Sequence, residues 1–367
     1  MSENRICLNM IVKDESAIIE ECLRSVAPYL DYYVICDTGS TDDTKDKILS
    51  VMDEYRINGE IHDIEFRNFE YARNKALELA KASSGVFNYI LFDDADMILE
   101  VEDENWKDNL SHDCYQVAQY NQMFYYNVRL VKKTSTSKYR GVTHEYLDCS
   151  GSKETINPKA LRYHDLACGS SRKEKFERDA RLLLEGIEKE PDQDLVTRYY
   201  FYLGQTYFDM GDIRNGIKYY EQRVNRGGWR EEVYYSMYKI GMGYKLLGDE
   251  SSMLHSFIKA YNYYPVRAEP IYELSSYYRE RGDYHSGYLF ARSACMTNFP
   301  EEDKLFVGKD IYDFKRWDEL SICSYWVGSY EESRDIAKGL LGNNKVPSEE
   351  IKRVQDNLKF AEEKCKI

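Results

Sequence analysis

Apolar and polar residues alternate in blocks along the first part of the chain, and the blocks predict strands and helices in turn. Short apolar runs, typical of buried strands, occupy residues 6–12, 32–36, 61–66 and 86–92. The segments between these runs have apolar residues three or four positions apart, which predicts helices over 16–27, 44–55 and 71–81. Such alternation indicates an α/β fold in which a mostly parallel sheet carries helices on both faces.

The pattern changes beyond residue 112, where the apolar runs become shorter. They predict further strands at 115–120, 126–131, 142–147 and 160–163. A charged segment at 171–186 then has helical periodicity. We therefore expect an α/β domain over residues 1–168, followed by a helical linker over 169–194.

Tyrosine, glycine and aspartate recur together in the second half of the chain. The pattern Tyr-x-x-x-Gly-Asp begins at Tyr207, Tyr244 and Tyr278, and its glycines are 37 and then 34 residues apart. A period of about 34 residues, with a glycine turn between two helices, is typical of tetratricopeptide repeats. We therefore predict tetratricopeptide-like α-helical repeats over 195–367, in which these glycines end the first helix of each pair.

The composition narrows the classes of function. The chain has 367 residues, 43% of them hydrophobic, which is enough for two folded domains. Its net charge of −14 argues against nucleic-acid binding, because phosphate contacts need clustered lysine and arginine. The sequence shows neither a signal-peptide pattern nor a membrane-spanning apolar run, and its nine cysteines form no Cys-x-x-Cys pair. We expect a cytoplasmic protein with reduced thiols, whose repeats offer a surface for a homodimer or another protein partner.

Three polar clusters follow predicted strands, at 13–15, 37–43 and 93–96. Because the carboxyl ends of parallel strands meet at one edge of a sheet, these clusters are expected to converge on a ligand site. Neighbouring carboxylates repel each other unless a positive group joins them, and a hard divalent cation is a suitable group. The spacing of Asp94 and Asp96 lets both point to one side, with Asp93 facing away.

Four segments carry a resemblance to a known family: LNMIVKDES, VICDTGSTDDT, FEYARNKAL and YILFDDADMIL. In this order and spacing, about the first 165 residues resemble a family 2 glycosyltransferase of the GT-A fold. The resemblance implies a nucleotide-diphosphate sugar donor, most often a UDP-hexose, and a Mn²⁺ or Mg²⁺ cofactor. It also implies inverting transfer of the sugar to a hydroxyl of a glycan, peptide or protein.

The resemblance also implies roles for residues that would hold the donor. Asp37 would contact the base or ribose of the nucleotide, and Glu15 would lie near the same end. Arg73 and Asn74 would position the donor together with Asp94. Without the resemblance, Arg73 could equally be a surface charge of its helix, and Asp37 could form an Asx turn.

Metal binding and proton transfer involve a second group of candidates. In the resemblance, Asp94 and Asp96 form the metal-binding DXD motif, with Asp96 as the direct ligand, and His164 completes the metal site. Transfer needs a base for the proton of the acceptor hydroxyl, and Glu145 and His144 are the candidates. Glu145 is preferred because the base in this fold is usually a carboxylate. In a strand over these positions only one of the two could face the site.

Alternatives remain for the function of the whole chain and for the role of four charged residues in its helical part. The whole chain could be a scaffold, with a front domain of little or no activity and repeats that bind proteins, although a scaffold has no need of unpaired acids. In the helical part, the charged residues Arg230, Glu232, Arg267 and Glu269 lie near the links between predicted repeats. They predict either a charged lining of the concave face or ion pairs between repeats.

Overall fold

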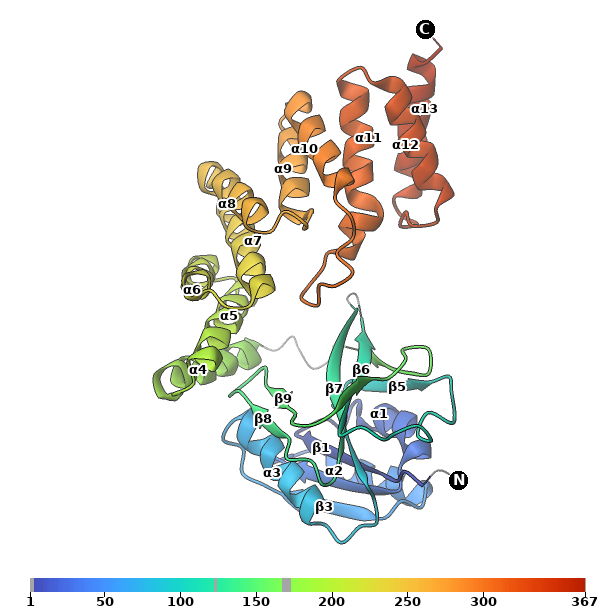
Figure 1. The fold of residues 1–367 in the computed structure, drawn as a ribbon, viewed down its shortest axis with the longest axis vertical. Helices are drawn as coiled ribbons and strands as arrows, with labels where there is room; N and C mark the ends of the chain where they lie inside the picture. Colours follow the sequence, from blue (N-terminus) through green and yellow to red (C-terminus); the bar gives the residue numbers. More distant parts are fainter. Residues whose placement is uncertain (1–2, 122–123, 167–172, 367) are drawn as a thin grey trace. The chain divides into compact units, whose positions relative to one another are not determined.

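The computed structural model describes residues 3–121, 124–166 and 173–366. It begins with an α/β arrangement and continues as paired helices (Figure 1), so the predicted fold class is confirmed. Among the described residues, none of the helices is both long enough and apolar enough to cross a membrane.

Most neighbouring strands of the main sheet run parallel. Over the described residues, this sheet has the order β3-β2-β1-β4-β7-β6-β11-β5, with β10 paired to β6. Its strands are β1 (Ile6–Val12), β2 (Tyr32–Asp37), β3 (Gly59–Asp63), β4 (Tyr89–Phe92), β5 (Met97–Val101), β6 (Cys114–Tyr120), β7 (Phe124–Lys132), β10 (Lys153–Thr155) and β11 (Leu161–Asp165). A separate ribbon pairs β8 (Lys138–Arg140) with β9 (Tyr146–Asp148).

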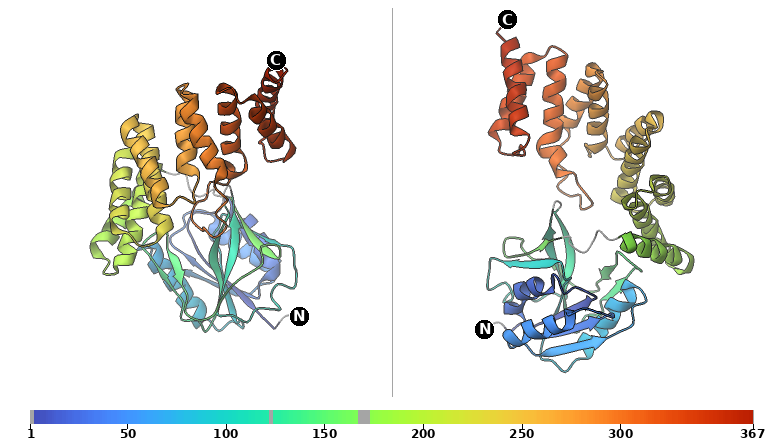
Figure 2. Two further views of the ribbon diagram at one scale, coloured as in Figure 1. Left: turned by 45° about the horizontal axis from the view of Figure 1, so that its top comes forward. Right: turned by 180° about the vertical axis from the view of Figure 1, so that it is seen from behind.

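Helices cover both faces of the parallel part of the sheet (Figure 2). The helices α1 (Ile19–Val26) and α2 (Thr44–Glu54) pack on one face, and α3 (Phe69–Ala82) packs on the other. Alternate side chains of β1 serve the two cores, since Leu8 packs with α1 and α2 whereas Cys7 packs with α3. Burial on both faces explains why β1 is a continuous apolar run rather than an alternating one.

One predicted strand is wrong over most of its length. Of the run 142–147, only the part from Tyr146 onward is a strand, and the residues from Gly141 to His144 form a turn. Gly141 has a φ of +110° and donates its N–H to Glu70 Oε2 at 2.8 Å, and His144 has a φ of +49°. Extended strands need negative φ, so the turn sets the directions of the two candidate bases.

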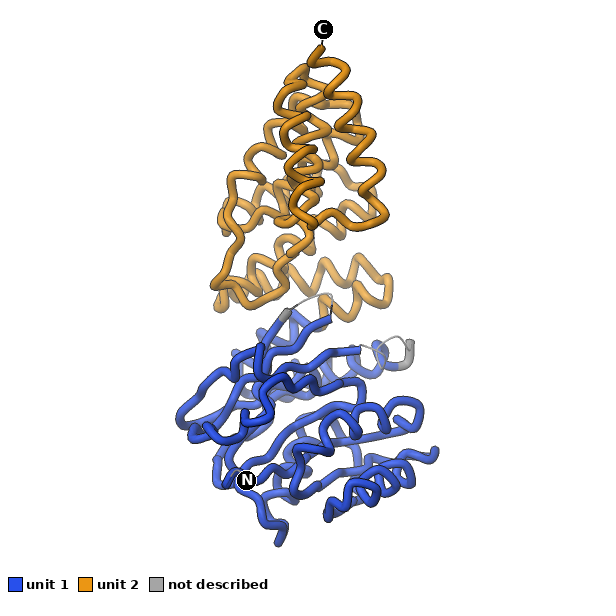
Figure 3. The backbone as a smooth tube through the Cα atoms, turned by 90° about the vertical axis from the view of Figure 1, so that its right-hand side faces the viewer, with its two compact units in different colours: residues 1–202 blue, residues 203–367 orange. Residues whose placement is uncertain are grey.

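The chain divides into two compact units, residues 1–202 and 203–367 (Figure 3). Before the division lies α4 (Lys173–Lys189), which corresponds to the helix predicted over 171–186. The first two residues of that predicted helix and the boundary predicted after residue 168 lie outside the described residues.

From α5, within which the division between the units falls, helices follow one another in pairs, with glycine turns inside the pairs. In order they are α5 (Gln193–Asp209), α6 (Ile213–Arg226), α7 (Arg230–Leu247), α8 (Glu250–Tyr263), α9 (Glu269–Glu280), α10 (Tyr284–Met296), α11 (Arg316–Trp326), α12 (Tyr330–Gly342) and α13 (Ile351–Lys364), with a π-helical turn at Ile311–Lys315. As predicted, Gly211, Gly248 and Gly282 follow first helices, with φ of +79°, +71° and +79°. These left-handed turns reverse the chain and allow the next helix to pack back on the one before.

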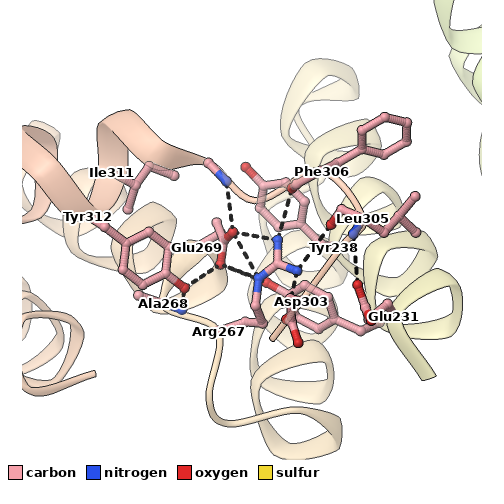
Figure 4. Close-up of polar contacts among 12 residues, drawn as sticks. Glu231, Tyr238, Arg267, Ala268, Glu269, Asp303, Leu305, Phe306, Ile311 and Tyr312 are labelled. Atoms are coloured by element: carbon pink, nitrogen blue, oxygen red, sulfur yellow. Dashed lines mark hydrogen bonds and ion pairs between the residues drawn. The ribbon is translucent and has the colours of Figure 1, made fainter. Parts of the chain in front are cut away.

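The second unit contains two buried ion pairs, one between α6 and α7 and one between the link that precedes α9 and the first residue of α9. Arg223 Nε donates to Glu232 Oε2 at 2.9 Å, and Arg267 Nη2 donates to Glu269 Oε1 at 2.6 Å (Figure 4). All four side chains are at most 5% exposed. Arg230 instead lies over a tyrosine ring, 4.3 Å from its centroid. For Glu232, Arg267 and Glu269 the ion-pair alternative therefore holds, rather than a lining of the concave face.

In the first unit, Asp113 ties the start of β6 to the turn before β10. Ser152 donates to Asp113 Oδ2 from its N–H at 2.8 Å and from Oγ at 2.9 Å, and Lys132 Nζ donates to Oδ1 at 3.2 Å. Because all three bonds favour the ionised carboxylate, they lower the pKa of Asp113 to about 2. The stabilisation from this group is therefore present above about pH 4 and is lost as the pH falls toward about 2.

We expect Asp113→Asn to lower the Tm by a few degrees at pH 7, because the neutral amide accepts weaker hydrogen bonds than the carboxylate. The difference from the wild type should shrink at pH 3, where the native carboxylate begins to lose its charge. Thermal melts followed by circular dichroism at both pH values measure this change. An equal difference at pH 7 and pH 3 would exclude Asp113 as the source of acid sensitivity.

Candidate active site

The loops after β1 and β2 are joined to each other at the carboxyl edge of the sheet. Asp14 Oδ1 accepts the Thr41 N–H at 2.7 Å, and the Glu15 N–H donates to Thr44 Oγ1 at 2.8 Å. These bonds hold the two loops side by side, as expected for strand ends that share one edge.

Asp37 is the last residue of β2, at the start of the second of these loops, and it is fully buried. Its Oδ1 accepts the N–H groups of Gly39 at 2.6 Å and Ser40 at 2.7 Å, which forms an Asx-type turn. Its Oδ2 is buried but accepts no hydrogen bond from the described residues. A buried carboxylate oxygen without a donor is costly, so this atom is suited to a hydrogen bond from a ligand.

Asp94 lies just beyond β4 and is held by two arginines. Arg73 Nη2, from α3, donates to Asp94 Oδ1 at 2.6 Å, and Arg129 Nη1, from β7, donates to Oδ2 at 2.7 Å. Burial raises the pKa of the Asp94 carboxyl, but the two guanidinium groups outweigh it and hold the pKa below its ordinary value. Asp94 is therefore a fixed carboxylate with its charge compensated by protein groups.

Asp93 points in a different direction from its neighbour. The side chain is fully buried, Oδ1 accepts the Asp94 N–H at 2.9 Å, and Cys22 Sγ lies 3.9 Å from Oδ2. Burial raises the pKa of this carboxyl well above its ordinary value, although Arg129 opposes the shift. Asp93 thus belongs to the core beneath the site and not to its open side.

Glu145 shares an arginine with Asp94. Arg73 Nε donates to Glu145 Oε1, so one guanidinium bridges two carboxylates. Both acids line a polar pocket of about 260 Å³, together with Arg129 and Tyr139. The structure therefore brings Arg73, Asp94 and Glu145, which were predicted from separate segments, into one small pocket suited to a polar ligand group.

Two other predicted residues have contacts elsewhere. His144 is exposed, and its ring stacks on Tyr202 with centroids 4.1 Å apart. Asn74 Nδ2 donates to the Tyr139 carbonyl and Asn74 Oδ1 accepts the Tyr139 N–H, both at 2.9 Å. The amide of Asn74 thus fixes β8 against α3, and the pocket beside Asp94 is lined by neither residue.

Asp96 and His164 are brought near each other by the pairing of β5 with β11. The Asp96 carbonyl accepts the Leu166 N–H at 2.9 Å, and the His164 ring stacks on Tyr120 with centroids 4.8 Å apart. In the described part of the chain, no group of three or more His, Cys, Asp or Glu side chains is placed so that it could hold a metal ion. Mg²⁺ typically needs only one or two carboxylates when substrate phosphates supply further ligands. Because both oxygens of Asp94 accept bonds from arginines, Asp96 is the carboxylate of the motif that would contribute to such a site.

The sequence reasoning did not identify Arg129 or Lys153, which also line the pocket. Arg129 is 7% exposed and lies in β7 between the apolar residues Val128 and Leu130. An arginine between apolar residues in a strand is unusual, because burial of its charge needs a partner. The position of Arg129 between apolar residues could therefore have indicated a buried ion pair, but not that its partner is Asp94.

The fold and the site define an α/β domain with a polar pocket beside a carboxylate that is fixed by two arginines. Residues 7–161 match the family model described as glycosyl transferase family 2. The predicted family is therefore confirmed for this domain, over residues 7–161.

Two curated proteins that are similar in sequence to this chain are also named as glycosyltransferases. The chain is 25% identical over 236 residues to the SPbeta prophage-derived glycosyltransferase SunS of Bacillus subtilis (strain 168), and the same values apply to glycosyltransferase SunS of Bacillus phage SPbeta. The alignment covers 60% of this chain and 53% of each relative. The chain thus spans about half the length of the curated relatives that it matches.

Solved structures of helical proteins are also similar to this chain. The crystal structure of MamA is 14% identical, with a TM-score of 0.33 and coverage of 55% of this chain and 95% of that one. A tetratricopeptide repeat protein from Parabacteroides merdae ATCC 43184 is 16% identical, with a TM-score of 0.39 and coverage of 52% and 69%.

Proposed function

We propose that this chain is a metal-dependent, inverting glycosyltransferase that moves a sugar from a nucleotide-diphosphate sugar to a hydroxyl of a glycan, peptide or protein. A UDP-hexose is the favoured donor. The observation that carries the proposal is the pocket in which Arg73 bridges Asp94 and Glu145 at the carboxyl edge of a family 2 domain. In this proposal residues 1–168 perform the transfer, 169–194 link the parts, and 195–367 bind the acceptor or a protein partner.

The donor would lie along the joined loops and reach the pocket. The buried Asp37 Oδ2 is suited to accept a hydrogen bond from an N–H or O–H of the nucleotide, and Glu15 lies in the adjoining loop. Arg73 carries the positive charge that a diphosphate needs, and Asn74 holds the neighbouring backbone in place.

Asp96 is the proposed direct ligand of Mn²⁺ or Mg²⁺. Both oxygens of Asp94 already accept bonds from arginine, which leaves Asp96 as the carboxylate of the motif to bind the ion, with His164 as the further predicted ligand. When bound, such an ion neutralises charge on the diphosphate as it departs. The protein's own part is to hold the Asp94 carboxylate in a fixed place and to offer the Arg73 guanidinium to the phosphates.

Glu145 is the proposed base. Its carboxylate would take the proton of the acceptor hydroxyl as that oxygen attacks the anomeric carbon. The bond from the anomeric carbon to the diphosphate breaks on the opposite face, so the configuration inverts. The support for Glu145 over His144 is position, because Glu145 lines the pocket and His144 stacks on Tyr202 away from it.

Calorimetry with UDP tests the donor and metal assignments together. We expect the wild type to bind UDP in the presence of MnCl₂ and Asp96→Ala to bind it roughly 10-fold or more weakly, because a lost ligand weakens the metal bridge. Without MnCl₂ the two proteins should bind UDP alike. Asp103→Ala, which removes an acid from the turn at the opposite end of β5, is the matched control.

The donor is then identified by incubating UDP- and GDP-sugars with the wild type and following metal-dependent release of the nucleotide by mass spectrometry. Equal UDP binding by the wild type and Asp96→Ala in MnCl₂ would overturn the metal assignment. Absence of nucleotide binding in every condition would instead favour the scaffold alternative.

A further inference from the structure

Arg129 is a buried charged residue of the site that lies outside the four segments on which the family resemblance rests. We infer that Arg129 is a positioning residue for sugar transfer: it fixes the Asp94 carboxylate from the β7 side so that the donor is bound in one orientation. This inference deepens the proposed function and rests on it. It concerns a residue that acts through Asp94 and not one that takes part in the bond changes.

Three protein groups surround the Arg129 guanidinium: Asp94, Tyr163 and Gln119. Nη1 donates to Asp94 Oδ2 at 2.7 Å, and the ring centroid of Tyr163 lies 5.8 Å from the central carbon of the guanidinium. The amide of Gln119, when turned so that its oxygen faces the arginine, accepts a bond from Nη2 at 2.7 Å. Gln119 and Tyr163 are themselves fully buried, so this surrounding is rigid.

The two arginines that bind Asp94 differ in how many carboxylates they bind. Arg73 divides its guanidinium between Asp94 and Glu145, and a bound diphosphate would compete for it. Arg129 makes its ion pair with Asp94 alone among the described residues, and it lies deeper in the protein, with 8% of its side chain exposed. Arg129 can therefore hold Asp94 in place while Arg73 turns toward a ligand.

A lysine cannot reproduce this arrangement. The planar fork of arginine serves Asp94 and Gln119 at the same time, whereas an ammonium group is a single point of charge on a flexible chain. Loss of the fork would leave Asp94 bonded only to Arg73, next to the buried carboxyl of Asp93. The carboxylate would then follow Arg73 rather than stay at a fixed place.

The test compares Arg129→Met and Arg129→Lys with Lys132→Met, a control that removes a cation from the same strand at a site remote from the pocket. We expect Arg129→Met to weaken UDP binding in MnCl₂ and to raise the KM of the sugar donor by roughly 10- to 100-fold, as for other residues that orient a ligand. The KM of the acceptor should not change. Arg129→Lys should recover only part of the loss, and Lys132→Met should behave as the wild type.

A double-mutant cycle with Asp94→Asn decides whether Arg129 acts through Asp94. In an Asp94→Asn background, Arg129→Met should cause little further loss of donor binding, because the interaction is already broken. A full additional loss in that background, or an unchanged donor KM in Arg129→Met, would overturn the inference. If Arg129→Met fails to fold by circular dichroism, the Arg129→Lys measurements decide in its place. Failure of the wild type itself to bind UDP or transfer sugar would count against the proposed function and not against Arg129 in particular.

Discussion

Replacement of Glu145 by glutamine is expected to slow sugar transfer by about 10²- to 10⁴-fold, the usual contribution of a general base. Glutamine has nearly the same shape as glutamate, and its amide oxygen can still accept the bond from Arg73. It cannot take a proton from the acceptor hydroxyl. The loss should therefore fall on kcat, with little change in the KM of the donor.

Initial rates of UDP release with donor and acceptor measure this effect, after the donor screen has identified the sugar. Glu70→Gln is the matched control, because Glu70 also lies beside the turn and accepts the Gly141 N–H at 2.8 Å, yet it does not line the pocket. His144→Gln should likewise have a small effect. A larger loss in His144→Gln than in Glu145→Gln would assign the base to the histidine instead.

Much of the fold could be predicted because its determinants are local. The apolar run of β1 is continuous because the strand is buried on both faces, and the glycines of the helical pairs are required where φ is positive. The prediction of a strand over 142–147 was wrong because local periodicity does not detect the turn at Gly141. There a hydrogen bond that the Gly141 N–H donates to a distant residue, Glu70, stabilises a conformation that the apolar pattern does not suggest.

The site could likewise be predicted only where short segments of the sequence determine it. Asp37 and Asp94 could be proposed from short segments, since Asp37 is the last residue of β2 and Asp94 lies two residues beyond the end of β4. Arg129 could not, because its partner depends on the register between β4 and β7. In that antiparallel pair Leu91 lies opposite Leu130, which brings Arg129 to the end of β4 and next to the acids. A single sequence contains no direct record of such a long-range register.

Arg267 gives the largest expected effect on stability. The Arg267 guanidinium is 1% exposed and bonds to Glu269 at 2.6 Å and to Asp303 Oδ2 at 3.2 Å (Figure 4). It also donates to the carbonyls of Leu305 at 3.3 Å and Phe306 at 2.9 Å, in the segment between α10 and the π-helical turn. Arg267→Met would leave two buried carboxylates and two carbonyls without this donor. We expect it to reduce the free energy of unfolding by about 3–5 kcal/mol.

Urea titrations followed by circular dichroism measure this loss, and an exposed pair of the same unit provides the control. Arg281 and Glu250 lie 2.5 Å apart, closer than Arg267 and Glu269, but their side chains are 49% and 50% exposed. Because water screens such a pair, Arg281→Met should cost less than about 1 kcal/mol. Equal losses in the two variants would mean that burial does not decide the strength of these pairs. A smaller loss in the Arg267→Met, Glu269→Met double variant than in Arg267→Met alone would attribute the cost to the unpaired buried carboxylate rather than to lost attraction.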